Sequence, residues 1–191
     1  MNLTASVLQL DRTAVQALRV TDAYSLHRVV YSLFDDVRSD AEKAASHASG
    51  ILYADQGGDF QHRTILLRLA RRDPCRLVRQ NAIASLRFVE GRATIRVLLT
   101  TLRDASPVLR AEAAEALSYH PRQEIMLGPL LRAAHDPDAE VRLFAAYTLG
   151  MHRFQEARST LEGLRTDAAM VPTFGTVADE ATRMLALLNE D

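Results

Sequence analysis

One short pattern recurs along this chain of 191 residues and limits how it can fold. An aspartate is followed six positions later by an arginine in residues 73–79, 104–110 and 136–142, with offsets of 31 and 32 residues. The register continues into an alanine and then a leucine: Ala82 and Leu86, Ala113 and Leu117, Ala145 and Leu149. A degenerate fourth copy without the arginine contains Val177, Ala181 and Leu185. Such a period indicates one supersecondary unit stacked several times, because each unit buries its apolar face only against its neighbours.

Within each repeat, apolar residues follow two helical stretches separated by a break. The spacing predicts helix pairs at 78–86 and 95–102, at 109–117 and 125–131, and at 141–149 and 157–164. Alanines on the first helix of each pair are expected to permit close helix approach. Asp73, Asp104 and Asp136 are expected to cap helix starts. One arginine per repeat is expected to reach an aspartate of the same or the neighbouring repeat and form a polar ladder: Arg79, Arg110 and Arg142.

This Asp-Pro…Val-Arg…Ala…Leu pattern resembles HEAT repeats over residues 73–191, in particular the short bacterial type also seen in phycobilisome lyases. The resemblance implies an α-solenoid but leaves function open, since the family includes scaffolds, lyase subunits and enzymes. Its metal-binding members use His-Glu pairs, and this sequence has no His-Glu dipeptide. We therefore expect no metal and no cofactor, and we interpret His120, His135 and His152 as ordinary loop histidines. The single cysteine, Cys75, excludes an internal disulfide.

Residues 1–72 lack the repeat period. Alternation predicts a strand within residues 2–10, an apolar stripe predicts a helix over 23–34, and residues 51–53 and 64–67 predict a hairpin. This order predicts a small α+β segment, a partial ferredoxin-like unit. The predicted fold class is therefore mostly α: an α-solenoid of HEAT-like helix pairs at 73–191, preceded by the α+β segment at 1–72.

Residues 64–72 admit a second interpretation. They occupy the place of the second helix of a repeat that ends at Asp73, as residues 95–103 do before Asp104. The apolar positions match only in part, since Leu69 falls on Thr100. We favour a strand to about Leu67, with helix or turn beyond it.

The predicted order of elements, with Tyr24-Ser-Leu-His27-Arg28 near the start of a helix, resembles the opening of CasE-type CRISPR repeat-processing endoribonucleases. The resemblance covers residues 1–72 and implies that Tyr24 and His27 lie near the scissile phosphate of a metal-independent endoribonuclease. The residue types suit that chemistry, because a histidine can move protons and a tyrosine can position a hydroxyl. Packing beside the apolar stripe explains the same pair equally well.

Charge is balanced overall, with 23 basic and 24 acidic residues, but the junction near residue 72 is strongly basic. Six arginines are assigned to RNA binding: Arg28, Arg63, Arg68, Arg71, Arg72 and Arg76. A solvated charged face is the alternative interpretation. No apolar run approaches the roughly 20 residues that span a bilayer, and the start of the chain lacks a secretory signal pattern. We expect a cytoplasmic protein with no membrane partner.

Two functions remain open. The first is a HEAT-repeat scaffold that carries a partial CRISPR endoribonuclease-like segment and associates with CRISPR-type hairpin RNA or with its protein complex. Whether it also cleaves RNA is undecided. The alternative is a module that binds a protein partner on one face of the solenoid and has no RNA role.

Overall fold

The computed structural model describes residues 60–73 and 76–190. Two compact units divide the chain, Met1–Val97 and Leu98–Asp191, and the boundary falls inside helix α7 (Arg92–Thr101). Each unit is described by itself. The predicted elements before residue 60 and the residues Tyr24, His27 and Arg28 lie outside the described residues, so the predicted ferredoxin-like segment and the boundary at residue 72 stay predictions.

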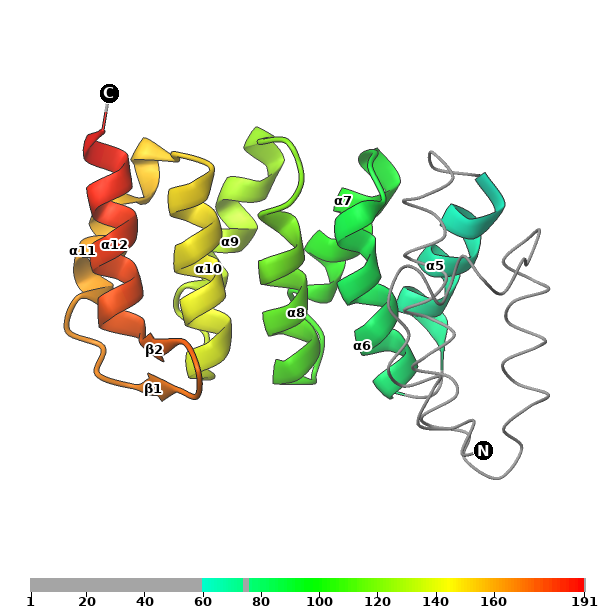
Figure 1. Cartoon of the computed structure of the whole chain (residues 1–191), viewed down its shortest axis with the longest axis horizontal. Helices are drawn as coiled ribbons and strands as arrows, with labels where there is room; N and C mark the ends of the chain where they lie inside the picture. The colour runs from blue at the N-terminus through cyan, green and yellow to red at the C-terminus, as the bar shows by residue number, and fades with distance from the viewer. Residues whose placement is uncertain (1–59, 74–75, 191) are drawn as a thin grey trace, which may run out of the picture. The chain divides into compact units, whose positions relative to one another are not determined.

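The described part of the first unit is helical (Figure 1). It contains α5 (Phe60–Arg72), α6 (Arg76–Ser85), a short 3-10 turn (Leu86–Phe88) and the start of α7. Leu66, Leu69 and Ala70 form the buried side of α5, at helical spacing. Gly91 has a φ of +121°, which lets the chain turn into α7 without the strain that a side chain would cause.

The predicted strand at 64–67 is wrong, because these residues lie in the middle of α5. A short apolar run does not distinguish a buried strand from a helix, and its continuation through Leu69 and Ala70 completes a helical face. The second interpretation, a repeat helix that ends at Asp73, is the one the structure has. The mismatch with Thr100 arises because Leu69 is buried whereas Thr100 is exposed.

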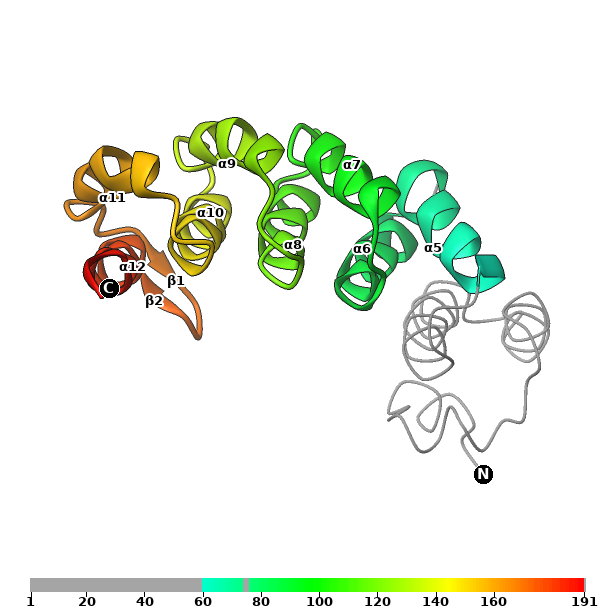
Figure 2. The ribbon, with the colours of Figure 1, turned by 90° about the horizontal axis from the view of Figure 1, so that it is seen from above.

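In the second unit the helices form two rows. Helices α8, α10 and α12 lie side by side in one row, with α9 and α11 in the other (Figures 1 and 2). The bounds are α8 (Pro107–Leu117), α9 (Leu127–Ala133), α10 (Ala139–Met151), α11 (Arg158–Leu164) and α12 (Val177–Asn189), with 3-10 turns at Glu124–Met126 and Gln155–Ala157. The predicted helix pairs and the fourth, degenerate copy are thus confirmed here.

Small residues hold the row of α8, α10 and α12 together. Ala113 and Ala145, at equivalent repeat positions, are fully buried. Farther along α10, a Cβ added at Gly150 would lie 2.5 Å from the Cβ of Met184 on α12. The helices approach so closely at this point that only glycine fits, as the alanine-rich first helices predict.

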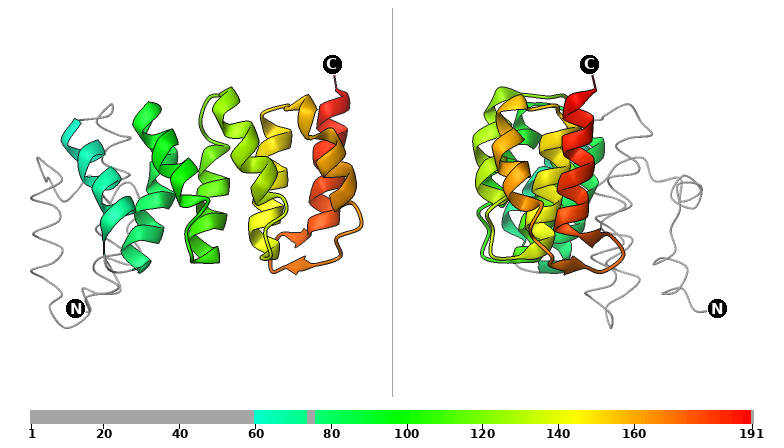
Figure 3. Two further views of the ribbon diagram at one scale, coloured as in Figure 1. Left: turned by 180° about the vertical axis from the view of Figure 1, so that it is seen from behind. Right: turned by 90° about the vertical axis from the view of Figure 1, so that its left-hand side faces the viewer.

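A short hairpin between α11 and α12 was not predicted. Its strands are β1 (Met170–Val171) and β2 (Gly175–Thr176), and they pair antiparallel (Figure 3). The aromatic ring of Phe174, at its turn, packs edge to face on Phe144 of α10 with the centroids 5.0 Å apart. The hairpin lengthens the last repeat, which explains why the spacing between the third and fourth copies of the pattern differs from the others.

The predicted polar ladder is confirmed in the second unit. Arg110 forms a fork with Asp136 of the next repeat, with Nε to Oδ2 at 2.8 Å and Nη2 to Oδ1 at 2.7 Å. Its Nη1 also donates to the backbone oxygen of Asp104 at 2.9 Å. Arg142 repeats this arrangement with Asp167, at 2.7 and 3.2 Å, and with the backbone oxygen of Asp136. Asp167, which sequence analysis missed, lies 31 residues after Asp136 and is the last acceptor of the ladder.

The expected capping role of the ladder aspartates is wrong in this unit. Asp104 and Asp136 accept the backbone N–H two residues further on, from Ser106 and Asp138, and so fold the turn before the helix. The cap of α10 is instead Asp138, which accepts from the N–H groups at positions 140 and 141. Both aspartates therefore shape the turn, and Asp136 also receives the arginine of the preceding repeat.

Candidate binding face

The outer side of α8 and α10 carries the side chains that the repeat core leaves uncovered. On and just after α8, the accessible residues Glu112, Glu115 and Tyr119 follow one another at steps of three and four, between buried positions of the helix. Of the equivalent positions 32 residues later, Tyr147 and Met151 are accessible and Phe144 is buried, while Glu140 near the start of α10 is also exposed. We define the acidic face as the surface formed by these side chains: Glu112, Glu115, Tyr119, Glu140, Tyr147 and Met151.

Negative charge is concentrated on this face. Partial burial of Glu140, together with the negative charges of Asp138 and Glu115, raises the pKa of the Glu140 carboxyl above its usual value. Glu115 lies on α8 and Glu140 on α10, and these two helices pack against each other in one row.

The arginines of α8, α10 and α12 form ion pairs with residues outside the acidic face. Arg110 and Arg142 bind the ladder aspartates, and Arg183 on α12 pairs with Glu180. Each of these arginines thus pairs with a carboxylate outside the acidic face.

Apolar side chains border the carboxylates. Tyr119 and Met151 are 55% and 46% exposed, and they occupy the same position of successive repeats. Phe88, in the first unit, occupies that position one repeat earlier and is 43% exposed. Sequence analysis missed these three residues, although they fall at the same position when the repeat sequences are aligned.

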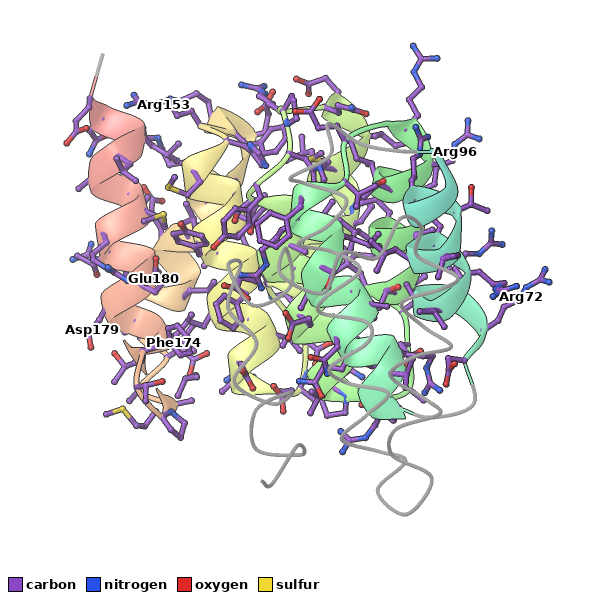
Figure 4. All side chains as sticks on the ribbon, turned by 45° about the vertical axis from the view of Figure 1, so that its right-hand side comes forward. Arg72, Arg96, Arg153, Phe174, Asp179 and Glu180 are labelled. Carbon is purple, nitrogen blue, oxygen red and sulfur yellow. The ribbon has the colours of Figure 1, made fainter. Side chains whose placement is uncertain are left out.

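Glu180 on α12, labelled in Figure 4, falls at the same position of its repeat as Glu112 and Phe144. Its side chain is only 2% exposed, and Oε1 has no hydrogen-bond partner among the described residues. A buried acceptor without a donor is costly, so this oxygen would gain from a donor supplied by a ligand or a water.

The structure brings together three of the predicted RNA-binding arginines. Arg68, Arg71 and Arg72 line one hollow on α5, together with Thr64 and Leu67. Arg76 is exposed at the start of α6. Arg63 is separate and partly buried: its guanidinium lies 3.3 Å from the place that a Cβ on Gly91 would take.

All three histidines lie in turns outside the helices, as the sequence predicts, but the prediction did not foresee that two of them are buried. His120 and His152 follow the ends of α8 and α10 but are buried, whereas His135 is exposed. The Nε2 atom of His152 lies 3.1 Å from the backbone oxygen of Leu117, and burial lowers the pKa of the ring. The equivalent residue one repeat before His120 is the buried Val89, so the repeat alignment contained the signal.

Within residues 60–73 and 76–190, no group of three or more His, Cys, Asp or Glu side chains is arranged to hold a metal ion. Over the same part of the chain, no helix has the length and apolar character required to cross a membrane.

The fold and the ladder define a helical repeat protein that resembles HEAT and armadillo solenoids. The family model of HEAT repeats matches residues 95–171. No curated protein matches the chain by sequence.

Solved structures similar to this chain have low sequence identity to it. An engineered protein has a TM-score of 0.61 at 19% identity, covering 97% of this chain and 87% of its own. A designed armadillo repeat protein in complex with the peptide (KR)4 has a TM-score of 0.55 at 17% identity, covering 98% of each chain. Human deoxyhypusine hydroxylase in complex with glycerol has a TM-score of 0.55 at 15% identity, covering 98% of this chain and 89% of its own. At these identities the likeness shows the fold alone. None of these proteins supports the predicted resemblance to CasE-type endoribonucleases or a CRISPR role.

Proposed function

We propose that the chain is a non-catalytic binding scaffold whose acidic face takes a basic, partly apolar segment of another protein. The observation that carries the proposal is the set of accessible side chains on α8 and α10, two helices packed against each other in one row, among which Glu112, Glu115 and Glu140 are acidic. A cationic segment suits such a surface, because complementary charge steers association and fixes the register of the partner.

The surrounding side chains suit such a partner. Tyr119 and Met151 offer exposed apolar contacts one repeat apart, so an extended segment crossing the row would meet alternating carboxylate and apolar sites. Aromatic and methionine side chains are enriched in the centres of protein interfaces. The designed armadillo repeat protein bound to (KR)4 shares the fold, which makes this basic peptide a suitable first probe.

Fluorescence anisotropy with labelled (KR)4 tests the proposal. The triple variant Glu112→Gln, Glu115→Gln, Glu140→Gln keeps side-chain size and removes three charges. At up to about 1 kcal/mol for each exposed charge contact, we expect the dissociation constant to rise between tenfold and a hundredfold.

A control triple removes the same charge from outside the acidic face, at Glu124, Glu156 and Glu162, which are exposed. It should bind within about twofold of the unmodified chain. Equal losses in both triples would show that only net charge matters. Absence of (KR)4 binding at low salt would also refute the proposal.

Association with CRISPR-type RNA or its protein complex, and RNA cleavage by Tyr24 and His27, remain predictions from the sequence. Hairpin RNA incubated with the full chain and with His27→Ala tests the catalytic part. Cleavage that continues undiminished in the variant would rule out a role for His27.

A further inference from the structure

The described part of the first unit has an unusual charge. Residues 60–97 contain nine arginines and only two acidic residues, Asp73 and Glu90, which gives a net charge of +7. The second unit is acidic by contrast. The basic character recognised at the junction therefore extends over residues 60–97, from α5 into α7.

Six of these arginines are exposed on helices: Arg68, Arg71, Arg72, Arg76, Arg92 and Arg96. Figure 4 shows Arg72 and Arg96 projecting outward from the ribbon. Arg68, Arg71 and Arg72 surround a hollow of about 330 Å³ on α5. None of these three forms an ion pair with another residue in the part of the chain that the structure describes. A cluster of guanidinium groups of this kind binds phosphate oxygens well, because the planar fork matches their geometry.

The positions of two arginines work against helix stability. Arg76 and Arg92 are the first residues of α6 and α7, and neither helix has an acidic residue in its first turn. A cation at a helix N-terminus opposes the macrodipole, so these residues are not explained by the needs of the helices. An anionic ligand would offset this cost.

The kind of anion follows from what the surface lacks. The apolar side of α5 is buried, so the helix has no exposed apolar stripe to insert into a membrane. Leu67 is the apolar residue that lines the hollow. Among the described residues no aromatic side chain lines it, whereas aromatic side chains dominate the binding energy of protein interfaces. Dense positive charge without such anchors is typical of surfaces that bind a nucleic-acid backbone.

We infer that α5 and the first turns of α7 bind the phosphodiester backbone of a nucleic acid, through Arg68, Arg71, Arg72 and Arg92. The interaction depends on the charge of the phosphate backbone and not on the base sequence. It uses the first unit, whereas the proposed peptide-binding function uses the second, so the two stand or fall separately.

Fluorescence anisotropy of the full chain with a labelled single-stranded RNA and a duplex of equal length tests the inference. Four phosphate contacts predict a slope of log affinity against log salt of about −3 for a single strand. Affinity should then fall roughly fiftyfold between 50 and 200 mM salt. A steeper slope on the duplex would identify double-stranded nucleic acid as the preferred form, and a weaker duplex affinity would identify the single strand.

The decisive variant is Arg68→Gln, Arg71→Gln, Arg72→Gln. It should weaken binding at least tenfold and make the salt slope shallower by about two. The matched control changes Arg103, Arg132 and Arg165, three exposed arginines of the second unit, to glutamine and should leave binding within about twofold. Lysine at positions 68, 71 and 72 keeps the charge and should retain most of the affinity, which separates lost contacts from lost folding.

Three results would overturn the inference. One is equal weakening by the control triple. The second is competition by poly-glutamate as strong as that by unlabelled RNA, which would indicate an acidic protein partner. The third is no measurable binding of either nucleic acid at 50 mM salt.

Discussion

The ion pair between Arg110 and Asp136 should contribute measurably to stability, and Asp136→Asn isolates its charge. Asparagine keeps an acceptor for the N–H of Asp138, so the turn is preserved, but the charged fork to Arg110 is lost. Both side chains are largely buried, with exposed fractions of 12% and 11%. The change therefore leaves a guanidinium that is poorly solvated and only partly paired.

The expected loss in the free energy of unfolding lies between two limits. Breaking a fully buried pair costs about 3–5 kcal/mol, whereas an exposed pair contributes roughly 0–1 kcal/mol. Arg110 retains its bonds to the backbone oxygens of Asp104 and Ala105, which reduces the penalty. We expect a loss of about 2 kcal/mol, corresponding to a fall in melting temperature of roughly 4–8 °C. Asp136→Ala also removes the turn acceptor and should cost about 1 kcal/mol more.

Chemical denaturation followed by circular dichroism measures the difference. The control is Glu124→Gln, because Arg122 and Glu124 form an ion pair that is 42% and 70% exposed and should contribute almost nothing. If Asp136→Asn is no more destabilising than this control, the ladder does not stabilise the repeats and the reasoning fails.

The same ion pair predicts that the stability of the fold depends on pH. Burial raises the pKa of Asp136, but the bonds from Arg110 and Asp138 outweigh it and hold that pKa below the ordinary value of 3.8. The unfolded chain therefore takes up the proton first as the pH falls. The stabilisation is complete above about pH 5, declines as the pH falls through 3.8, and is lost below the folded pKa. Asp136→Asn should be less sensitive than the unmodified chain over this range.

Two further predictions concern the close packing of the second unit. Gly150→Ala should destabilise the fold by about 1–3 kcal/mol, because the added Cβ meets Met184. Gly163→Ala, where a Cβ has nothing within 4 Å, should stabilise the fold by about 0.5–1 kcal/mol. Thermal melts that rank the two variants alike would contradict this. His152→Leu should reduce the acid sensitivity of folding: burial lowers the pKa of His152, so its contribution is present above 6.5, the ordinary pKa, and is lost as the pH falls through the folded pKa. Stability curves of both chains between pH 5 and 7.5 measure the effect, and identical curves would refute it.

The parts of the fold that follow a local period were predictable. The helix pairs and the arginine of each repeat recur at fixed spacing, and neighbouring repeats of the second unit stack on one another in sequence order. The hairpin at Met170–Thr176 was missed because an insertion breaks the period, and α5 was misassigned because Ile65, Leu66 and Leu67 suit either a strand or a helix. Glu115 and Glu140 act together only after stacking brings two helices side by side, so no linear motif marks the acidic face.

The ladder in the second unit has a direction. Each repeat supplies an arginine to the repeat that follows and an aspartate to the repeat that precedes it, as Arg110 with Asp136 and Arg142 with Asp167 show. A duplicated copy of residues 105–136 inserted after Asp136 would meet a matching partner at both junctions. The number of repeats can therefore change by whole units through gene duplication while every junction keeps its ion pair, so the length of the binding surface can evolve independently of its stability.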